Sequence, residues 1–223
     1  MMSADGSFRE HINKICQSAR NMCAWILRTF KSRSSELMLT TWKSLVLPIL
    51  DYCSQLWCPQ KRGEIQQIEE LQKSFTRKIP GHGLENYWDR LQSLRMYSLE
   101  RRRERYRIIY VWKILENMVP NLNMPSSKFK TSTSLRNGRK CVIPTIIKSA
   151  TTRISSLREG SLAVNGAQLF NALPRHIRDI TGVEVPEFKK KLDEFLSSIP
   201  DQPQSPGYTA ARQAESNSLL YMI

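Results

Sequence analysis

The chain has 223 residues, of which 40% are hydrophobic, so it can build a sizeable core and is too apolar for a wholly disordered protein. Its 34 Lys and Arg against 20 Asp and Glu give a net charge of +14 and a pI of about 9.8. This excess predicts a polyanionic partner, with nucleic acid ahead of an acidic membrane surface and of no such partner at all. No apolar run is long enough to predict a membrane-spanning helix.

Apolar residues recur at helical spacing through most of the first 120 residues. The pattern i, i+3, i+4, i+7 predicts helices over 8–30, from Ser34 or Ser35 to about Pro48, over 62–78, and from Ser98 to about Asn117. Pro48 is expected to kink or end the second of these helices. An apolar stretch over 52–57 and a short helix over 84–94 complete the series. We therefore expect residues 8–120 to form a helical domain after a disordered start over 1–7.

The second half of the chain has a different composition. Residues 121–140 are rich in Ser, Thr, Asn and Lys and predict a linker. Residues 141–199 are expected to form a small C-terminal region: an extended segment over 141–147, a short helix over 161–171 and an amphipathic helix over 186–199. Residues 200–223 predict a disordered tail. The predicted fold class is mainly α, a helical bundle followed by a linker and a small, mostly extended and helical C-terminal region.

No group of residues in the sequence has the pattern of a catalytic or metal centre. The three histidines are far apart, the five cysteines follow neither a disulfide nor a zinc pattern, and no Gly-rich phosphate loop is present. The carboxylates are dispersed on predicted helices, where solvated faces explain them better than a two-metal site: Glu64, Glu69, Glu70, Glu85, Asp89, Glu100 and Glu104. We therefore expect no enzyme, no cofactor and no metal, and an intracellular protein, cytoplasmic or nuclear, with reduced thiols.

The most informative local feature is an arginine run on the predicted helix after Ser98. Helical spacing places its arginines along two adjoining sides, where guanidinium groups could bracket phosphates. A solvated helix face is the alternative interpretation. Two further basic spots follow, one just before the Pro80 turn and one made of Arg28, Lys31 and Arg33. The predicted phosphate contacts are Arg101, Arg102, Arg103 and Arg105, and then Arg77 and Lys78.

Several stretches together resemble the region downstream of the polymerase motifs in non-LTR retrotransposon reverse transcriptases of the LINE, CR1/L2-like or jockey-like kind. The matching words span nearly the whole chain, at 8–12, 41–57 (TWKSLVLPILDYCSQLW), 68–79, 91–103, 170–174 (FNALP), 188–193 and 216–220. The chain departs from that family at Phe170, where the family has Trp, and at Leu47, where a basic residue is common.

The resemblance implies a fragment that lacks the polymerase palm and its catalytic carboxylates. Residues 8–120 would correspond to the thumb, which grips the primer–template duplex. The implied partner is an RNA or DNA duplex bound without sequence preference, or the palm itself if another polypeptide supplies it; no membrane partner is implied. The rival hypothesis is a helical protein-interaction scaffold, or an inert relic, in which the apolar stripe that contains Phe188 and Phe195 binds another helix.

Overall fold

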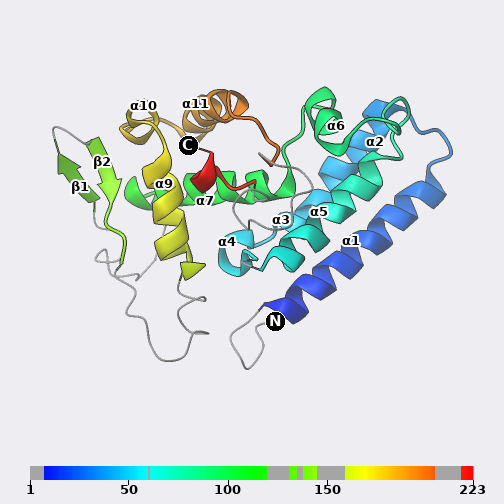
Figure 1. Ribbon diagram of the computed structural model, residues 1–223, viewed down its shortest axis with the longest axis horizontal. Coiled ribbons are helices and arrows are strands. Elements are labelled where there is room, and N and C mark those ends of the chain that lie inside the picture. Colours follow the sequence, from blue (N-terminus) through cyan, green and yellow to red (C-terminus); the bar gives the residue numbers. More distant parts are fainter. Residues whose placement is uncertain are drawn as a thin grey trace. The chain divides into compact units, whose positions relative to one another are not determined.

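The chain was analysed as a computed structural model that describes residues 8–59, 61–119, 131–134, 138–144, 159–203 and 217–222 (Figure 1). Within these ranges it is mainly helical, as predicted. The chain divides into two compact units, Met1–Glu100 and Arg101–Ile223. The division falls inside a helix rather than at the predicted boundary near residue 120. The predicted disordered start over 1–7 lies outside the described residues.

Unit 1 contains two long helices that lie side by side, α1 (Arg9–Thr29) and α5 (Arg62–Thr76) (Figure 1). Both were predicted from their apolar periodicity, which places one stripe of each helix inside. The buried stripe of α1 joins that of α5 in a single hydrophobic core. Its fully buried members include Ile12, Cys16, Ala19, Ile26, Met38, Trp42, Val46, Ile68, Phe75 and Ile79.

The segment from residue 35 to residue 51 stays helical throughout, as α2 (Ser35–Thr41), a π-helical turn (Trp42–Val46) and α3 (Leu47–Asp51). Ser34 is the N-cap, because its hydroxyl accepts a hydrogen bond from the Leu37 N–H at 3.2 Å. Pro48, in the first turn of α3, does not end the helix, although it lacks the N–H that an interior helical residue donates. The wider turn before it, closed by the Leu47 N–H on the Trp42 carbonyl, absorbs the change. A short helix, α4 (Ser54–Trp57), follows.

The end of unit 1 carries α6 (Tyr87–Ser93) and the start of α7 (Leu99–Leu115). The sequence suggested that Glu69 lies on a solvated face, and the structure corrects this. Its carboxylate accepts hydrogen bonds from the backbone N–H groups of Leu99 at 3.0 Å and Glu100 at 3.3 Å, and from the Tyr87 hydroxyl. A negative charge at these free N–H groups stabilises the start of a helix. Glu69 thus ties α5 to the beginning of α7.

We expect Glu69→Ala to lower the free energy of unfolding by about 1–2 kcal/mol, since it removes a charged cap from two helix N–H groups. Urea unfolding followed by circular dichroism measures this. Its neighbour Glu70 is exposed and only ion-paired with Lys73 at 3.6 Å, so Glu70→Ala is the matched control, with a change below about 1 kcal/mol. Equal effects of the two substitutions would contradict the capping role.

Unit 2 is built around α7 from Arg101 onward. The π-helical turn Leu162–Gly166 leads into α9 (Ala167–Ala172), and α10 (Arg175–Arg178) precedes α11 (Val185–Ser197). The predictions of a short helix over 161–171 and an amphipathic helix over 186–199 are confirmed within a residue or two. At the centre, Trp112 and Phe188 stack with ring centroids 4.2 Å apart, and the Trp112 indole N–H donates to the Ile180 carbonyl at 2.9 Å.

Two segments predicted to lack structure are partly ordered in unit 2. Inside the predicted linker, β1 (Thr131–Ser134) pairs antiparallel with β2 (Gly138–Cys141). β2 ends at Cys141, the residue at which the extended segment was predicted to begin. Asn171 of α9 fixes β2, because its amide bonds both the N–H and the carbonyl of Cys141. In the predicted tail, the 3-10 turn Leu219–Tyr221 has Leu219 fully buried. The rest of both predictions lies outside the described residues.

Candidate nucleic-acid interface

The arginine run on α7 faces the interior of unit 2 more than the solvent. Arg101 and Arg103 expose 0% and 3% of their surface, and Arg107 exposes 1%. A guanidinium without accessible surface cannot touch a phosphate. The structure therefore corrects the prediction that Arg101 and Arg103 are phosphate contacts.

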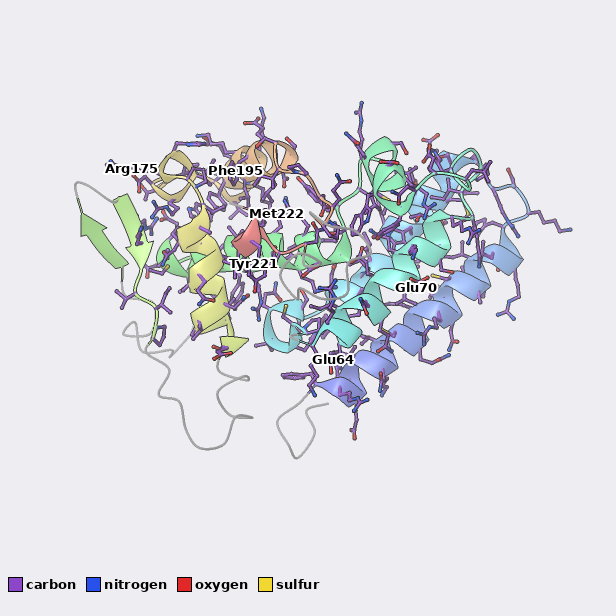
Figure 2. The ribbon with its side chains drawn as sticks, viewed as in Figure 1. Glu64, Glu70, Arg175, Phe195, Tyr221 and Met222 are labelled. Atoms are coloured by element: carbon purple, nitrogen blue, oxygen red, sulfur yellow. The ribbon has the colours of Figure 1, made fainter. Side chains whose placement is uncertain are left out.

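Partners within unit 2 occupy these guanidinium groups. Arg101 donates to the Pro200 carbonyl at 3.1 Å and lies 3.8 Å from the Asp201 carboxylate. Its guanidinium also donates to the sulfur of Met222 at 3.0 Å (Figure 2). Arg105 binds both carboxylate oxygens of Asp193 on α11, one of them at 2.6 Å. The carboxylates of Asp201 and Asp193 thus occupy positions at which phosphates were predicted. We no longer count Arg105 as a phosphate contact either, since a bidentate pair would have to break first.

Glu104, predicted to lie on a solvated face, belongs to the same interior. It is 7% exposed, and its carboxylate accepts hydrogen bonds from the Ser218 hydroxyl and, at 2.8 Å, from the Leu219 N–H. The sequence does contain a signal for this burial. Arg101 and Glu104 lie seven residues before Ile108 and Val111, so they continue the buried stripe of α7 by two helical turns.

The other predicted contacts lie nearer the solvent. Arg102 is half-buried, and its guanidinium donates to the Tyr106 hydroxyl at 2.7 Å and stacks on that ring 5.1 Å from its centroid. Arg77 and Lys78 are exposed, just past the end of α5. Of the six predicted residues, the structure therefore leaves Arg77, Lys78 and Arg102 as candidate phosphate contacts.

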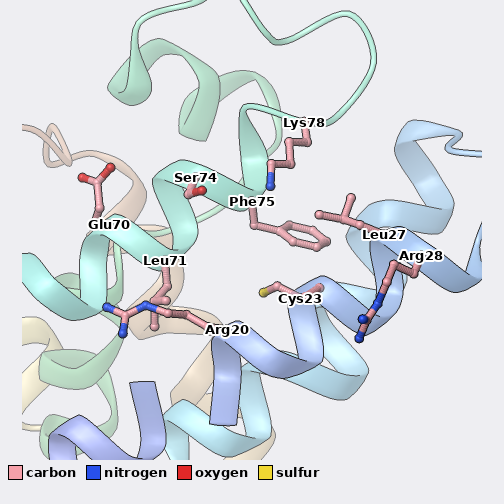
Figure 3. A pocket seen from close by; sticks show the side chains of 10 residues that line it. Arg20, Cys23, Leu27, Arg28, Glu70, Leu71, Ser74, Phe75 and Lys78 are labelled. Carbon is pink, nitrogen blue, oxygen red and sulfur yellow. The ribbon is translucent and has the colours of Figure 1, made fainter. Parts of the chain in front are cut away.

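The structure brings Lys78 together with two cations of α1. A groove of about 520 Å³ lies between α1 and α5, and Arg20, Arg28 and Lys78, all three of them exposed, line it (Figure 3). Lys78 extends toward Cys23 and Phe75 in that view. None of the three cations makes an ion pair with another residue that the structure describes, and Glu70 is the single acid lining the groove. The sequence placed Arg28 and Lys78 in separate basic spots, because it does not reveal that α1 and α5 are neighbours.

The floor of this groove is apolar, and its one thiol is unreactive at physiological pH. Cys23, Ala24 and Leu27 come from α1, and Leu71 and Phe75 from α5, with Ser74 as the one hydroxyl. Burial raises the pKa of the Cys23 thiol to about 11, although the neighbouring Lys78 ammonium pulls this pKa down. Cys23 is therefore a neutral thiol at physiological pH and a poor nucleophile. The groove has the character of a binding surface with a cationic rim.

The apolar stripe on which the scaffold hypothesis depended is already occupied. Phe188 is completely buried against Trp112, and Phe195 is partly buried, with its ring edge-to-face with His176. The stripe of α11 therefore forms the core of unit 2 and offers no face to a partner helix.

None of the helices in the described ranges is both long and apolar enough to cross a bilayer. Within the same ranges no group of three or more His, Cys, Asp or Glu side chains is placed to hold a metal ion. Comparisons of the chain with known protein families, with curated proteins and with solved structures found no match.

Proposed function

We propose that this chain is a nucleic-acid-binding module that corresponds to the region downstream of the polymerase palm in a non-LTR retrotransposon reverse transcriptase. The proposed origin depends on the sequence words that resemble that family. The binding proposal depends on one observation: three exposed cations, none of them ion-paired with a residue that the structure describes, line a single groove of unit 1. The net charge of +14 supports a polyanion as the partner.

The proposed contacts differ from those first expected from the sequence. Arg20, Arg28 and Lys78 touch phosphates, and Arg77 and Arg102 are accessory cations near the solvent. Phosphate contacts of this kind carry no sequence information, so the module binds RNA or DNA without strong sequence preference. Each contact releases condensed counterions, which makes the affinity fall steeply with salt.

The test is binding to a labelled RNA–DNA duplex across a salt series. The variant Arg20→Glu/Arg28→Glu/Lys78→Glu is compared with Lys31→Glu/Lys43→Glu/Lys61→Glu, which changes the net charge equally at exposed positions that do not line the groove. We expect the groove variant to lose at least about tenfold more affinity than the control, and its salt slope to fall by about three units, one for each contact.

Two results would refute the proposal. Equal losses in the two triple variants would mean that only the total charge matters. Absence of binding at low salt by the folded wild-type chain would remove the nucleic-acid role altogether.

A further inference from the structure

The groove between α1 and α5 contains more than cations. Its floor is made of apolar side chains, and its volume of about 520 Å³ lies in the range of pockets that enclose small organic ligands. A regular duplex presents phosphates and sugars on its outside, which would satisfy the rim and leave the floor empty. A partner that fits both parts combines negative charge with an apolar group.

We infer that the groove receives an unstacked base of a single-stranded nucleic acid, while the rim cations hold the flanking phosphates. This inference rests on the proposed function and specifies its ligand. Grooves that track a single strand combine positive charge with aromatic side chains on which bases stack, and this stacking tolerates any base. Phe75 is an aromatic side chain in the lining of this groove.

The placement of the rim cations fits this arrangement. Arg20 and Arg28 are eight residues apart on α1, which is about 12 Å along the helix axis. Ala24 and Leu27 of the floor lie between them in the sequence, and Lys78 approaches from the end of α5 (Figure 3). The floor is thus flanked by cations on both sides. Ser74 supplies a hydroxyl that can donate to or accept from the edge of any base.

Ala24 offers a substitution that fills the groove without removing a cation or a buried contact. It is exposed within α1 and lines the groove, so Ala24→Trp puts a large ring where the base is expected to lie. Ser18→Trp is the matched control, because Ser18 is also exposed on α1 and does not line the groove. Thermal unfolding of both variants verifies that they fold like the wild-type chain.

The probes are a labelled oligouridylate and an RNA–DNA duplex with the same number of phosphates. We expect Ala24→Trp to weaken oligouridylate binding about tenfold or more, the loss of one stacked base, and to change duplex binding less than twofold. Ser18→Trp is expected to change neither. Equal weakening of both ligands by Ala24→Trp, or no weakening of either, would overturn the inference.

Photocrosslinking provides a second readout that does not depend on a variant. An oligouridylate carrying one 5-iodouracil is expected to crosslink to the peptide that contains Cys23 or to the one that contains Phe75. Crosslinks only to other surfaces, with binding still sensitive to the Arg20/Arg28/Lys78 triple reversal, would overturn the base site and leave the proposed function intact. Failure of both nucleic acids to bind would refute both. Tighter binding of an acidic, leucine-bearing peptide than of an oligouridylate of equal charge would overturn the inference in favour of a protein partner.

Discussion

Replacing Arg101 or Arg107 by alanine is expected to lower the free energy of unfolding by about 3 kcal/mol each. Arg107 donates to the Asn165 side chain and, at 2.8 Å, to the Gly160 carbonyl, while Arg101 holds Pro200 and Asp201. Truncation leaves these buried acceptors with fewer donors and opens a cavity as long as the lost side chain. Urea unfolding followed by circular dichroism measures the change.

The matched control for these variants is Arg28→Ala, which removes an exposed cation of the groove. We expect its stability to stay within about 0.5 kcal/mol of the wild-type value while its salt slope for duplex binding falls by about one unit. The Arg101 and Arg107 variants should show the opposite, an unchanged salt slope at temperatures where they are folded. A fully stable Arg101→Ala protein with a reduced slope would restore the arginine run as a phosphate-binding surface.

Deleting residues 217–222 is expected to lower the stability of unit 2 by about 3–5 kcal/mol. The deletion uncovers the site of Leu219, which is completely buried, and leaves the Glu104 carboxylate without the Ser218 hydroxyl and the Leu219 N–H. Removing hydrogen-bond donors from a buried charge is strongly destabilising. Differential scanning calorimetry of the full-length and shortened chains measures the loss.

Two further variants separate the contributions of individual residues to this loss of stability. Tyr221→Ala removes a half-exposed ring from the same segment and should cost less than about 1 kcal/mol. Glu104→Leu should cost stability in the full-length chain yet restore part of it in the shortened one, because it removes the buried charge whose hydrogen bonds to Ser218 and Leu219 the deletion takes away. A shortened chain as stable as the full-length one would show that residues 217–222 do not hold unit 2 together.

The helices of unit 1 and α11 could be predicted from the sequence because their burial is a local periodic property. Apolar residues repeat along α1 and α5 with the period of the helix, and Pro186 in the first turn of α11 marks its start. The cap at Ser34 was predictable for the same reason, as one residue type beside a helical pattern.

The burial of the arginine run on α7 is harder to predict, because the seven-residue spacing from Arg101 and Glu104 to Ile108 and Val111 is its one local signal. A charged run normally indicates a solvated face, and here the acids that neutralise it are distant in sequence, since Asp193 lies 88 residues beyond Arg105. With few acids nearby in the sequence, the run has the pattern of a phosphate-binding surface. The groove of unit 1 was missed for a related reason, because its cations come from α1 and from beyond the end of α5, and only the packing of these helices makes them neighbours.

The bond between Glu104 and the segment 217–222 also has a consequence for the synthesis of the chain. Glu104 leaves the ribosome more than a hundred residues before its partners Ser218 and Leu219. All residues of the unit 1 core, which runs from Ile12 to Leu99, have been synthesised by then. Unit 2 cannot complete its packing around α7 until residue 222 has been made. During this interval the exposed α7 is open to polyanions and to aggregation, so slow elongation over the second half of the chain should lower the yield of folded protein.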